Sequence, residues 1–218
     1  NKATPNKHIN TTPIINHTSS LDIVLSLLSL YLTLFMGSTV LSYGTLNGKS
    51  YFDMFCTLDR DDQRGTLNWL YYINLLTKYY ELTDTVFLVI KKKPVTFLHG
   101  YHHPATLVFA WIIIMESPGM EWTVLILNLL VHTIMYFYYA MSSINIRLPG
   151  KFIITQAQMI QFVIGNSIGF IQMFGYGQCM RWEDKATIWY HVVYTSCLLL
   201  LFRAFYQRTY KKKEKMKK

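Results

Sequence analysis

Three histidines within five residues form the densest group of reactive side chains in this sequence: His99, His102 and His103. Their spacing of i, i+3 and i+4 places the three imidazoles on one face of a helix. An imidazole can bind a metal, transfer a proton or act as a nucleophile. The cluster therefore predicts a chemical site, whose type must be decided by the residues around it.

Charged residues with a similar spacing precede this cluster. Lys78, Glu81 and Asp84 are each three residues apart, so we expect them on one helix face as well. One interpretation is a self-neutralising ion network that fixes the packing of helices. The other is a group of acids and bases that belongs to the same site as the histidines, and the two interpretations are compatible.

A third polar stripe follows, and it consists of His132, Met135, Tyr136 and Tyr139. These residues have the spacing of a single helix face, and Asn128 lies one turn before them. Phe137 and Tyr138 are expected to point elsewhere, into a packing seam or a membrane interface. The stripe adds a fourth histidine to the candidate site.

Hydroxyl and amide groups form a fourth stripe with the residues Thr155, Gln156, Gln158 and Gln161. Amides within lipid often join helices by hydrogen bonds. They can equally donate hydrogen bonds to a substrate, and for each residue taken alone both interpretations remain open.

The elements that carry these stripes are long and apolar. The 218 residues are 51% hydrophobic and 15% charged, whereas a soluble domain has roughly 25% charged residues. Six stretches are long enough to cross a bilayer, which takes about 20 residues: 21–43, 67–90, 95–115, 120–141, 152–174 and 187–207. We therefore predict an all-α, polytopic membrane protein with a segment 1–20, a membrane domain 21–207 and a tail 208–218.

The depth of the polar residues in these spans indicates a single chamber. A charge at the centre of a bilayer costs about 2.5–3.5 kcal/mol, so polar stripes are expected to face the interior of the bundle. At about 1.5 Å per residue, four spans place their polar groups roughly 9–18 Å from the same side of the membrane. Pro104 is expected to begin the regular helix of its span, where its missing N–H is harmless.

Basic residues predict the orientation of the spans. With the lysine-rich tail placed in the cytosol, fourteen Lys and Arg residues fall on the cytosolic side and five on the opposite side, as membrane proteins usually show. The formal net charge of +9 also raised nucleic acid as a partner. We expect none, because the basic residues cluster at the ends of apolar stretches and form no binding face.

The three cysteines are too few for a disulfide scaffold. Cys56 and Cys179 fall on the non-cytosolic side, where an oxidising lumen permits a disulfide, and two unpaired thiols are the alternative. Cys197 lies within the last span and is interpreted as a packing residue.

The order and spacing of the four stripes resemble a known family. The motifs are Lys78-x-x-Glu81-x-x-Asp84-Thr85, His99-x-x-His102-His103, His132-x-x-Met135-Tyr136-x-Tyr138-Tyr139 and Thr155-x-x-Gln158-x-x-Gln161. Together they look like the ELO family of very-long-chain fatty acid elongases, the 3-ketoacyl-CoA synthases of the endoplasmic reticulum. The resemblance covers roughly residues 15–208, and it is the ordered set of motifs that is specific.

The resemblance implies a barrel of six helices around a narrow acyl tunnel. The family has seven spans, so the first is expected to be missing from this sequence. The substrates would be acyl-CoA and malonyl-CoA, with no further cofactor and no metal. Membrane lipid, a second copy in a homodimer, and the reductases and dehydratase of the elongation cycle are the implied partners. The cytosolic lysines Lys92 and Lys93 would bind substrate phosphates.

The implied reaction passes through an acyl-histidine. His102 is the expected acyl acceptor, with His103 or His132 as its base and Glu81 or Asp84 orienting an imidazole. The residues assigned to catalysis are His99, His102, His103, His132, Glu81 and Asp84. Those assigned to substrate binding are Lys78, Asn128, Tyr136, Tyr139, Gln158, Gln161, Lys92 and Lys93.

Two other functions fit parts of the pattern. A di-iron desaturase or hydroxylase also uses clustered histidines, but this resemblance class needs about eight of them, and only four histidines and two carboxylates lie at the predicted depth. A proton-coupled lipid carrier would use histidine and carboxylate relays, yet the sequence shows no duplicated half of the kind common in carriers.

Overall fold

Six long helices make up the part of the chain that the computed structural model describes, which is residues 12–48, 50, 64–90, 92, 94–116, 121–146, 148–174 and 185–211. The helices are α1 (Thr12–Asn47), α3 (Arg64–Ile90), α4 (Phe97–Glu116), α5 (Glu121–Ser143), α6 (Lys151–Phe174) and α7 (Lys185–Tyr206). One π-helical turn, η3 (Gln207–Lys211), continues α7. The predicted all-α fold is confirmed, and five of the six helices begin within three residues of the predicted position.

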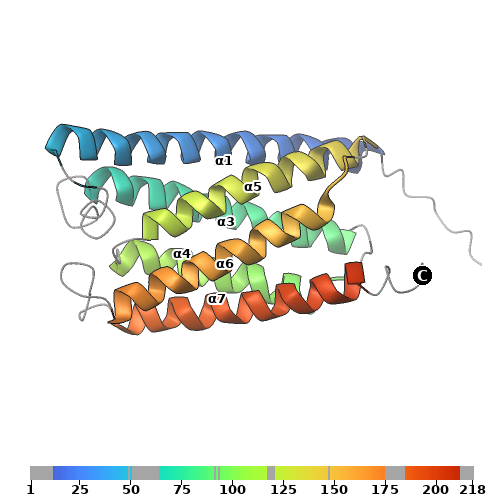
Figure 1. The fold of residues 1–218 in the computed structure, drawn as a ribbon. Helices are drawn as coiled ribbons and strands as arrows, with labels where there is room; N and C mark the ends of the chain where they lie inside the picture. Colours follow the sequence, from blue (N-terminus) through green and yellow to red (C-terminus); the bar gives the residue numbers. More distant parts are fainter. Residues whose placement is uncertain are drawn as a thin grey trace, which may run out of the picture.

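The helices close into a ring. Around it the neighbouring pairs are α1 with α3, α3 with α4, α4 with α7, α7 with α6, α6 with α5, and α5 with α1. Neighbours run in opposite directions, and α1 begins at the same end of the bundle at which α7 ends (Figure 1). This arrangement is the barrel of six helices that was predicted, with an interior enclosed by all six elements.

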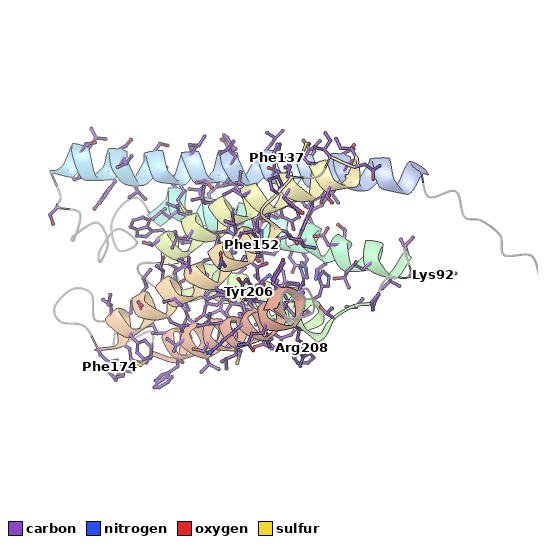
Figure 2. All side chains as sticks on the ribbon, turned by 45° about the vertical axis from the view of Figure 1, so that its right-hand side comes forward. Lys92, Phe137, Phe152, Phe174, Tyr206 and Arg208 are labelled. Atoms are coloured by element: carbon purple, nitrogen blue, oxygen red, sulfur yellow. The ribbon has the colours of Figure 1, made fainter. Side chains whose placement is uncertain are left out.

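Apolar side chains cover the outside of this ring. Exposed large side chains of α6 include Phe152, Ile160, Val163 and Phe174, and α3 exposes Trp69. Phe137, Phe152 and Phe174 project from the ribbon in Figure 2, while Lys92 and Phe174 mark opposite ends of the bundle. An apolar exterior around buried polar groups is the arrangement expected for a protein whose solvent is lipid.

Three stretches within the described residues are long and apolar enough to cross a membrane: Ser19–Asn47, Glu121–Ser143 and Lys185–Tyr210. The other three helices, α3, α4 and α6, carry most of the predicted polar stripes. Their charged, imidazole and amide groups lower the average hydropathy although their outward faces are apolar. The chain is therefore a multi-pass membrane protein, and one of its four stripe-bearing helices, α5, is among the three apolar stretches.

The start of α4 differs from the expectation. Thr96 caps the helix, since its Oγ1 accepts a hydrogen bond from the His99 backbone N–H at 3.3 Å, as N-cap residues do. The helix begins at Phe97 and Pro104 lies inside it, so the prediction that Pro104 starts the helix was wrong. The cap outweighed the proline, which removes only one backbone hydrogen bond, and it places all three histidines in the first two turns.

Helices α6 and α7 approach closely at two glycines. A Cβ at Gly169 would lie 2.6 Å from Cγ2 of Val192, and one at Gly165 would lie 3.4 Å from Nε2 of His191. Small residues allow helices in membranes to pack backbone against backbone. The glycines therefore fix the spacing of this pair of helices.

Candidate active site

A polar cavity of about 230 Å³ lies at the end of the ring where α4 and α6 begin. Its lining comes from five helices and the segment before α4, and the residues are Glu81, Asp84, Thr96, Leu98, His99, His102, His103, His132, Met135, Tyr136, Tyr138, Tyr139, Lys151, Ile154, Thr155, Gln158, Phe202 and Phe205. All four histidines and both carboxylates assigned to catalysis from the sequence are among them. Three of the polar stripes, on α3, α4 and α5, meet in this one space, together with part of the stripe on α6.

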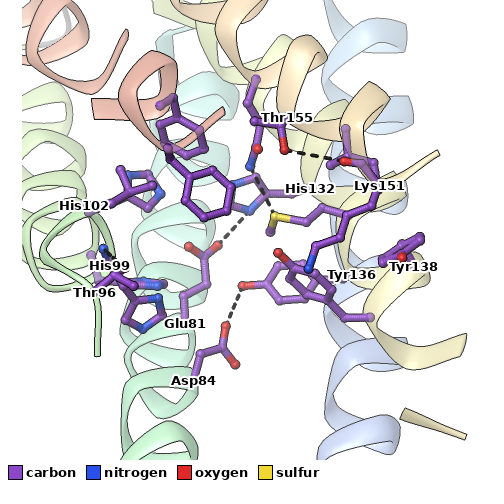
Figure 3. A pocket seen from close by; sticks show the side chains of 18 residues that line it. Glu81, Asp84, Thr96, His99, His102, His132, Tyr136, Tyr138, Lys151 and Thr155 are labelled. Atoms are coloured by element: carbon purple, nitrogen blue, oxygen red, sulfur yellow. Dashed lines mark hydrogen bonds and ion pairs between the residues drawn. The ribbon is translucent and has the colours of Figure 1, made fainter. Parts of the chain in front are cut away.

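Glu81 is the charged centre of the cavity. Its Oε1 lies 2.7 Å from Lys78 Nζ and 3.1 Å from His132 Nδ1. Figure 3 shows Glu81 and His132 pointing toward one another across the space. All three side chains are at most 6% exposed, so each charge is compensated by a partner rather than by water, as buried charges must be.

The Lys78 ammonium also reaches α5. Its Nζ donates a hydrogen bond to Asn128 Oδ1 at 3.2 Å, so a single lysine ties the carboxylate of its own helix to an amide on another. This contact gives Asn128 a structural partner. It leaves fewer donors of the ammonium free for a substrate than the assignment of Lys78 to substrate binding assumed.

Asp84 pairs with a tyrosine. The hydroxyl of Tyr136 donates a hydrogen bond to Asp84 Oδ2 at 3.2 Å, and the ring of Tyr139 stands edge-on at 6.4 Å from that of Tyr136. Neither carboxylate of α3 has a described hydrogen bond to the histidines of α4. The expectation that Glu81 or Asp84 orients an imidazole therefore applies to Glu81 and His132 alone.

The histidine cluster is a row of mutually tilted rings along α4. The centroids of His99 and His103 are 4.3 Å apart, and those of His102 and His103 are 5.4 Å apart. His99 Nε2 lies 2.9 Å from Thr85 Oγ1 on α3. The motif residue Thr85 thus holds the first ring, and the other two rings extend further into the bundle.

A second cavity of about 50 Å³ continues from His102 toward the far end of the ring. Its walls include the apolar side chains Phe109, Ala110, Ile113, Val124, Leu125 and Phe162. Lys78, Asn128 and Gln161 line this cavity, and none of these three is part of the first lining. His102 is the histidine common to both cavities.

The amide stripe divides between the interior and the surface. Gln158 Nε2 donates a hydrogen bond to Met135 Sδ at 3.4 Å inside the first cavity, while Gln156 is exposed and donates to Tyr206 at 3.3 Å. Thr155 is buried in the lining. Tyr138 also lines the cavity, so the prediction that it points elsewhere was wrong, whereas Phe137 is half exposed as expected.

Of the remaining predicted residues, Lys92 is the one that the structure describes, and it lines neither cavity. Lys92 stands in the turn before α4 and is exposed, with a positive φ of 52°. Lys93, Cys56 and Cys179 lie outside the described residues. Their assignment to phosphate binding and to a disulfide therefore stays a prediction.

One buried pair was missed by the sequence reasoning. Glu121 Oε1 lies 2.7 Å from His191 Nδ1, and the two side chains are 1% and 0% exposed. Both residues lie within predicted spans, yet neither belongs to a polar stripe that the sequence analysis assigns to the site. The signal that could have found them is one ionisable residue near the start of each of two apolar helices, α5 and α7, which begin at the same end of the bundle.

Comparison with known proteins places this arrangement in a family. The sequence model of the ELO family (GNS1/SUR4 family) matches residues 9–218. Long chain fatty acid elongase 2 of Caenorhabditis elegans is 37% identical over 169 residues, which are 72% of this chain and 58% of the relative. Fatty acid elongase sre1 of Dictyostelium discoideum is 32% identical over 190 residues, 79% of this chain and 69% of the relative.

A further match is long chain fatty acid elongase 1 of Caenorhabditis elegans, 34% identical over 143 residues, or 63% of this chain and 49% of the relative. The chain spans about half the length of several of these curated relatives. The family match covers nearly the whole sequence, and it includes every helix that lines the two cavities. The chain therefore belongs to the ELO family of fatty acid elongases.

Proposed function

We propose that this protein condenses a long-chain acyl-CoA with malonyl-CoA to give 3-ketoacyl-CoA, CoA and CO₂, the first step of fatty acid elongation. The observation that carries the proposal is the position of His102, which lines both the polar first cavity and the second cavity, whose exposed walls are mainly apolar. A reaction that joins a hydrocarbon chain to a charged, soluble thioester needs both environments on the two sides of one reactive group. The names of the relatives, all fatty acid elongases, support the same class of reaction.

His102 is the proposed acyl acceptor. In the first half-reaction its imidazole nitrogen attacks the thioester carbonyl, the carbon–sulfur bond breaks, and the CoA thiolate leaves and takes a proton. The acyl chain would occupy the second cavity, where apolar side chains replace water. A nucleophilic side chain divides a difficult transfer into two easier steps, and an acyl-imidazole is reactive enough for the second.

The second half-reaction forms the carbon–carbon bond. Malonyl-CoA loses CO₂, and the electron pair of the broken bond becomes an enolate. The enolate carbon attacks the acyl carbon, and the bond from that carbon to the His102 nitrogen breaks and restores the imidazole. Negative charge on the enolate oxygen requires nearby donors, for which His132, Tyr136 and the Gln158 amide are the candidates in the first cavity.

The rim of the first cavity suits the CoA groups. Lys151 is exposed at the start of α6 and lines the opening, and Lys92 and Arg208, two other basic residues of the predicted cytosolic side, lie toward the same end of the bundle (Figure 2). This distribution supports entry of both substrates from the cytosol, with the C-terminus on that side. An endoplasmic reticulum location, a homodimer and cooperation with the reductases and dehydratase of the cycle belong to the same proposal.

A metal-dependent desaturase finds less support. Within the described helices, no group of three or more His, Cys, Asp and Glu side chains is arranged to hold a metal ion. The rings of the histidine cluster lie 4.3–5.4 Å apart by centroid and are tilted against one another. The described hydrogen-bond partners of His99 and His102 are the hydroxyl groups of Thr85 and Thr106.

The experiment is an assay of purified protein with labelled malonyl-CoA and a series of acyl-CoAs, with product mass analysis. The variant His102→Ala should lose condensation by a factor of at least a thousand while its elution profile and Tm stay close to those of the wild type. Gln156→Ala, on the outer face of α6, is the control and should keep the activity. Near-normal product from His102→Ala would exclude His102 as the acyl acceptor.

A further inference from the structure

The His102 ring is held by a hydroxyl chain that reaches another helix. Thr106, one turn further along α4, has its Oγ1 3.1 Å from His102 Nδ1 and 2.7 Å from the His102 backbone oxygen. The hydroxyl of Tyr194 on α7 lies 2.5 Å from the same Oγ1. Tyr194 is 4% exposed, so this chain of contacts is shielded from solvent.

The protons available to these three hydrogen-bonded side chains decide which nitrogen of the His102 ring is protonated. A threonine hydroxyl has one proton and two acceptor sites. The backbone oxygen of His102 can only accept, and at 2.7 Å it is the closer of the two groups that His102 offers. When Thr106 donates to that oxygen, its own Oγ1 accepts from Tyr194 O–H and from a proton on His102 Nδ1.

We propose that Thr106 and Tyr194 are positioning residues that hold His102 as the tautomer protonated on Nδ1, with the lone pair on Nε2 free for the acyl group. This inference rests on the proposed function, in which His102 accepts the acyl chain. It assigns to two hydroxyl groups on α4 and α7 a task that carboxylates perform in many other enzymes. It also requires no separate base, because the neutral ring already presents a lone pair.

The carboxylates of the site do not supply this contact. Glu81 faces His132, and Asp84 accepts its described hydrogen bond from Tyr136. Among the described residues, the hydroxyl of Thr106 is thus the hydrogen-bond partner recorded for the His102 ring.

The contact has a consequence during the first half-reaction. Attack by Nε2 leaves a positive charge on the acylated ring, and the Nδ1–H then becomes a stronger donor. Thr106 Oγ1 is in place to accept this bond, and Tyr194 polarises the Thr106 oxygen from the other side. A ring in the opposite tautomer would present Nε2–H to the thioester and could not attack from that atom.

The test compares four variants in the first half-reaction, measured as CoA release from an acyl-CoA in the absence of malonyl-CoA. Thr106→Val keeps the side-chain volume and removes the hydroxyl that accepts from His102 Nδ1, so the rate should fall about 10–100-fold. This fall is larger than the loss of one hydrogen bond alone would cause. It is smaller than the fall expected if the ring were fixed in the wrong tautomer. Thr106→Ser restores the hydroxyl and should return the rate to within about threefold of the wild type. KM for acyl-CoA should change little in both.

The other two variants separate positioning from packing. Tyr194→Phe leaves Thr106 in place and should lower the rate by only about 3–10-fold, the value of one neutral hydrogen bond. Thr33→Val on α1, a helix that lines neither cavity, removes an equivalent hydroxyl bond to the carbonyl four residues earlier and should leave the rate unchanged. A Thr106→Val enzyme as fast as the wild type, or a Thr106→Ser enzyme as slow as Thr106→Val, would overturn the inference.

A direct readout of the tautomer is the ¹⁵N spectrum of histidine-labelled protein, with the His102 signals identified by their absence in His102→Ala. The wild type should show a protonated Nδ1, and an Nε2–H form would contradict the proposal. The failures are distinguishable. If His102→Ala still condenses, the proposed function fails, whereas an inactive His102→Ala with an unaffected Thr106→Val overturns only the role of the hydroxyl chain.

Discussion

The buried pair of Glu121 and His191 should behave as one unit in the stability of the barrel. The two side chains are almost completely buried, and Glu121 Oε1 lies 2.7 Å from His191 Nδ1. Coulomb's law gives about 6 kcal/mol for unit charges at this distance in an effective dielectric constant of about 20. Much of that attraction is offset by the cost of removing both groups from water, so the net value of the pair is smaller than the cost of breaking it.

Single substitutions should therefore cost more than the double one. Glu121→Leu or His191→Leu leaves an ionisable partner buried and unpaired, which destabilises by about 3–5 kcal/mol. For a chain of this size this corresponds to a fall in Tm of roughly 6–20 °C. The double variant replaces the pair by apolar groups, and such replacements are often neutral or stabilising by about 1–4 kcal/mol.

The assay is thermal unfolding of the four proteins in the same detergent, analysed as a double-mutant cycle. We expect the double variant to lie closer to the wild type than either single variant does. The reasoning would be refuted if the losses of the two single variants simply added in the double variant, because independent contributions would mean that neither group compensates the other.

Three further predictions concern packing, backbone and charge. Gly169→Ala should lower the stability by about 1–3 kcal/mol through overpacking, measured as a fall in Tm. Adding Val192→Ala should restore most of the lost stability. Gly37→Ala is the control and should cost nothing, because its Cβ would meet nothing within 4 Å. Lys92→Gly should raise stability by up to about 1 kcal/mol, because the φ of 52° strains a residue with a side chain. Lys151→Ala should raise KM for the CoA substrates about 2–5-fold at low salt and less at high salt, since exposed charges are screened.

The helices could be predicted from the sequence because lipid imposes a simple rule on it. Each stretch of about 20 apolar residues became a helix, and the stripes at helical spacing turned inward as the cost of exposed charge requires. The length of α1 beyond residues 21–43 was missed, since the polar residues before position 21 carry no apolar signal. Pro104 was misjudged because a side-chain cap three residues before the histidines determined where α4 begins.

The contacts between side chains of the site could not be predicted from residue spacing alone. Periodicity shows which face of a helix a residue occupies, but the rotation and axial shift of one helix relative to another decide which side chains are in contact. Thus Asp84 faces Tyr136 and Glu81 faces His132, although both carboxylates share one face of α3. The role of Glu121 was missed for a related reason, because the sequence does not show whether a carboxylate in the first turn of a span points outward or into the bundle.

The side-chain pairs that cross the interior explain why chemistry and stability are joined in this fold. Lys78 with Asn128, Glu81 with His132, and Asp84 with Tyr136 all connect α3 to α5, which are not neighbours in the ring but lie on either side of α1. The pair described above likewise connects α5 to α7 behind α6. Between helices in lipid no hydrophobic driving force exists, so packing and polar contacts must hold the barrel. Groups that span the interior therefore both hold the helices together and line the cavity. A substitution at Glu81 should lower the free energy of unfolding together with the rate. A substitution at Thr106, which contacts the neighbouring helix α7, should lower mainly the rate.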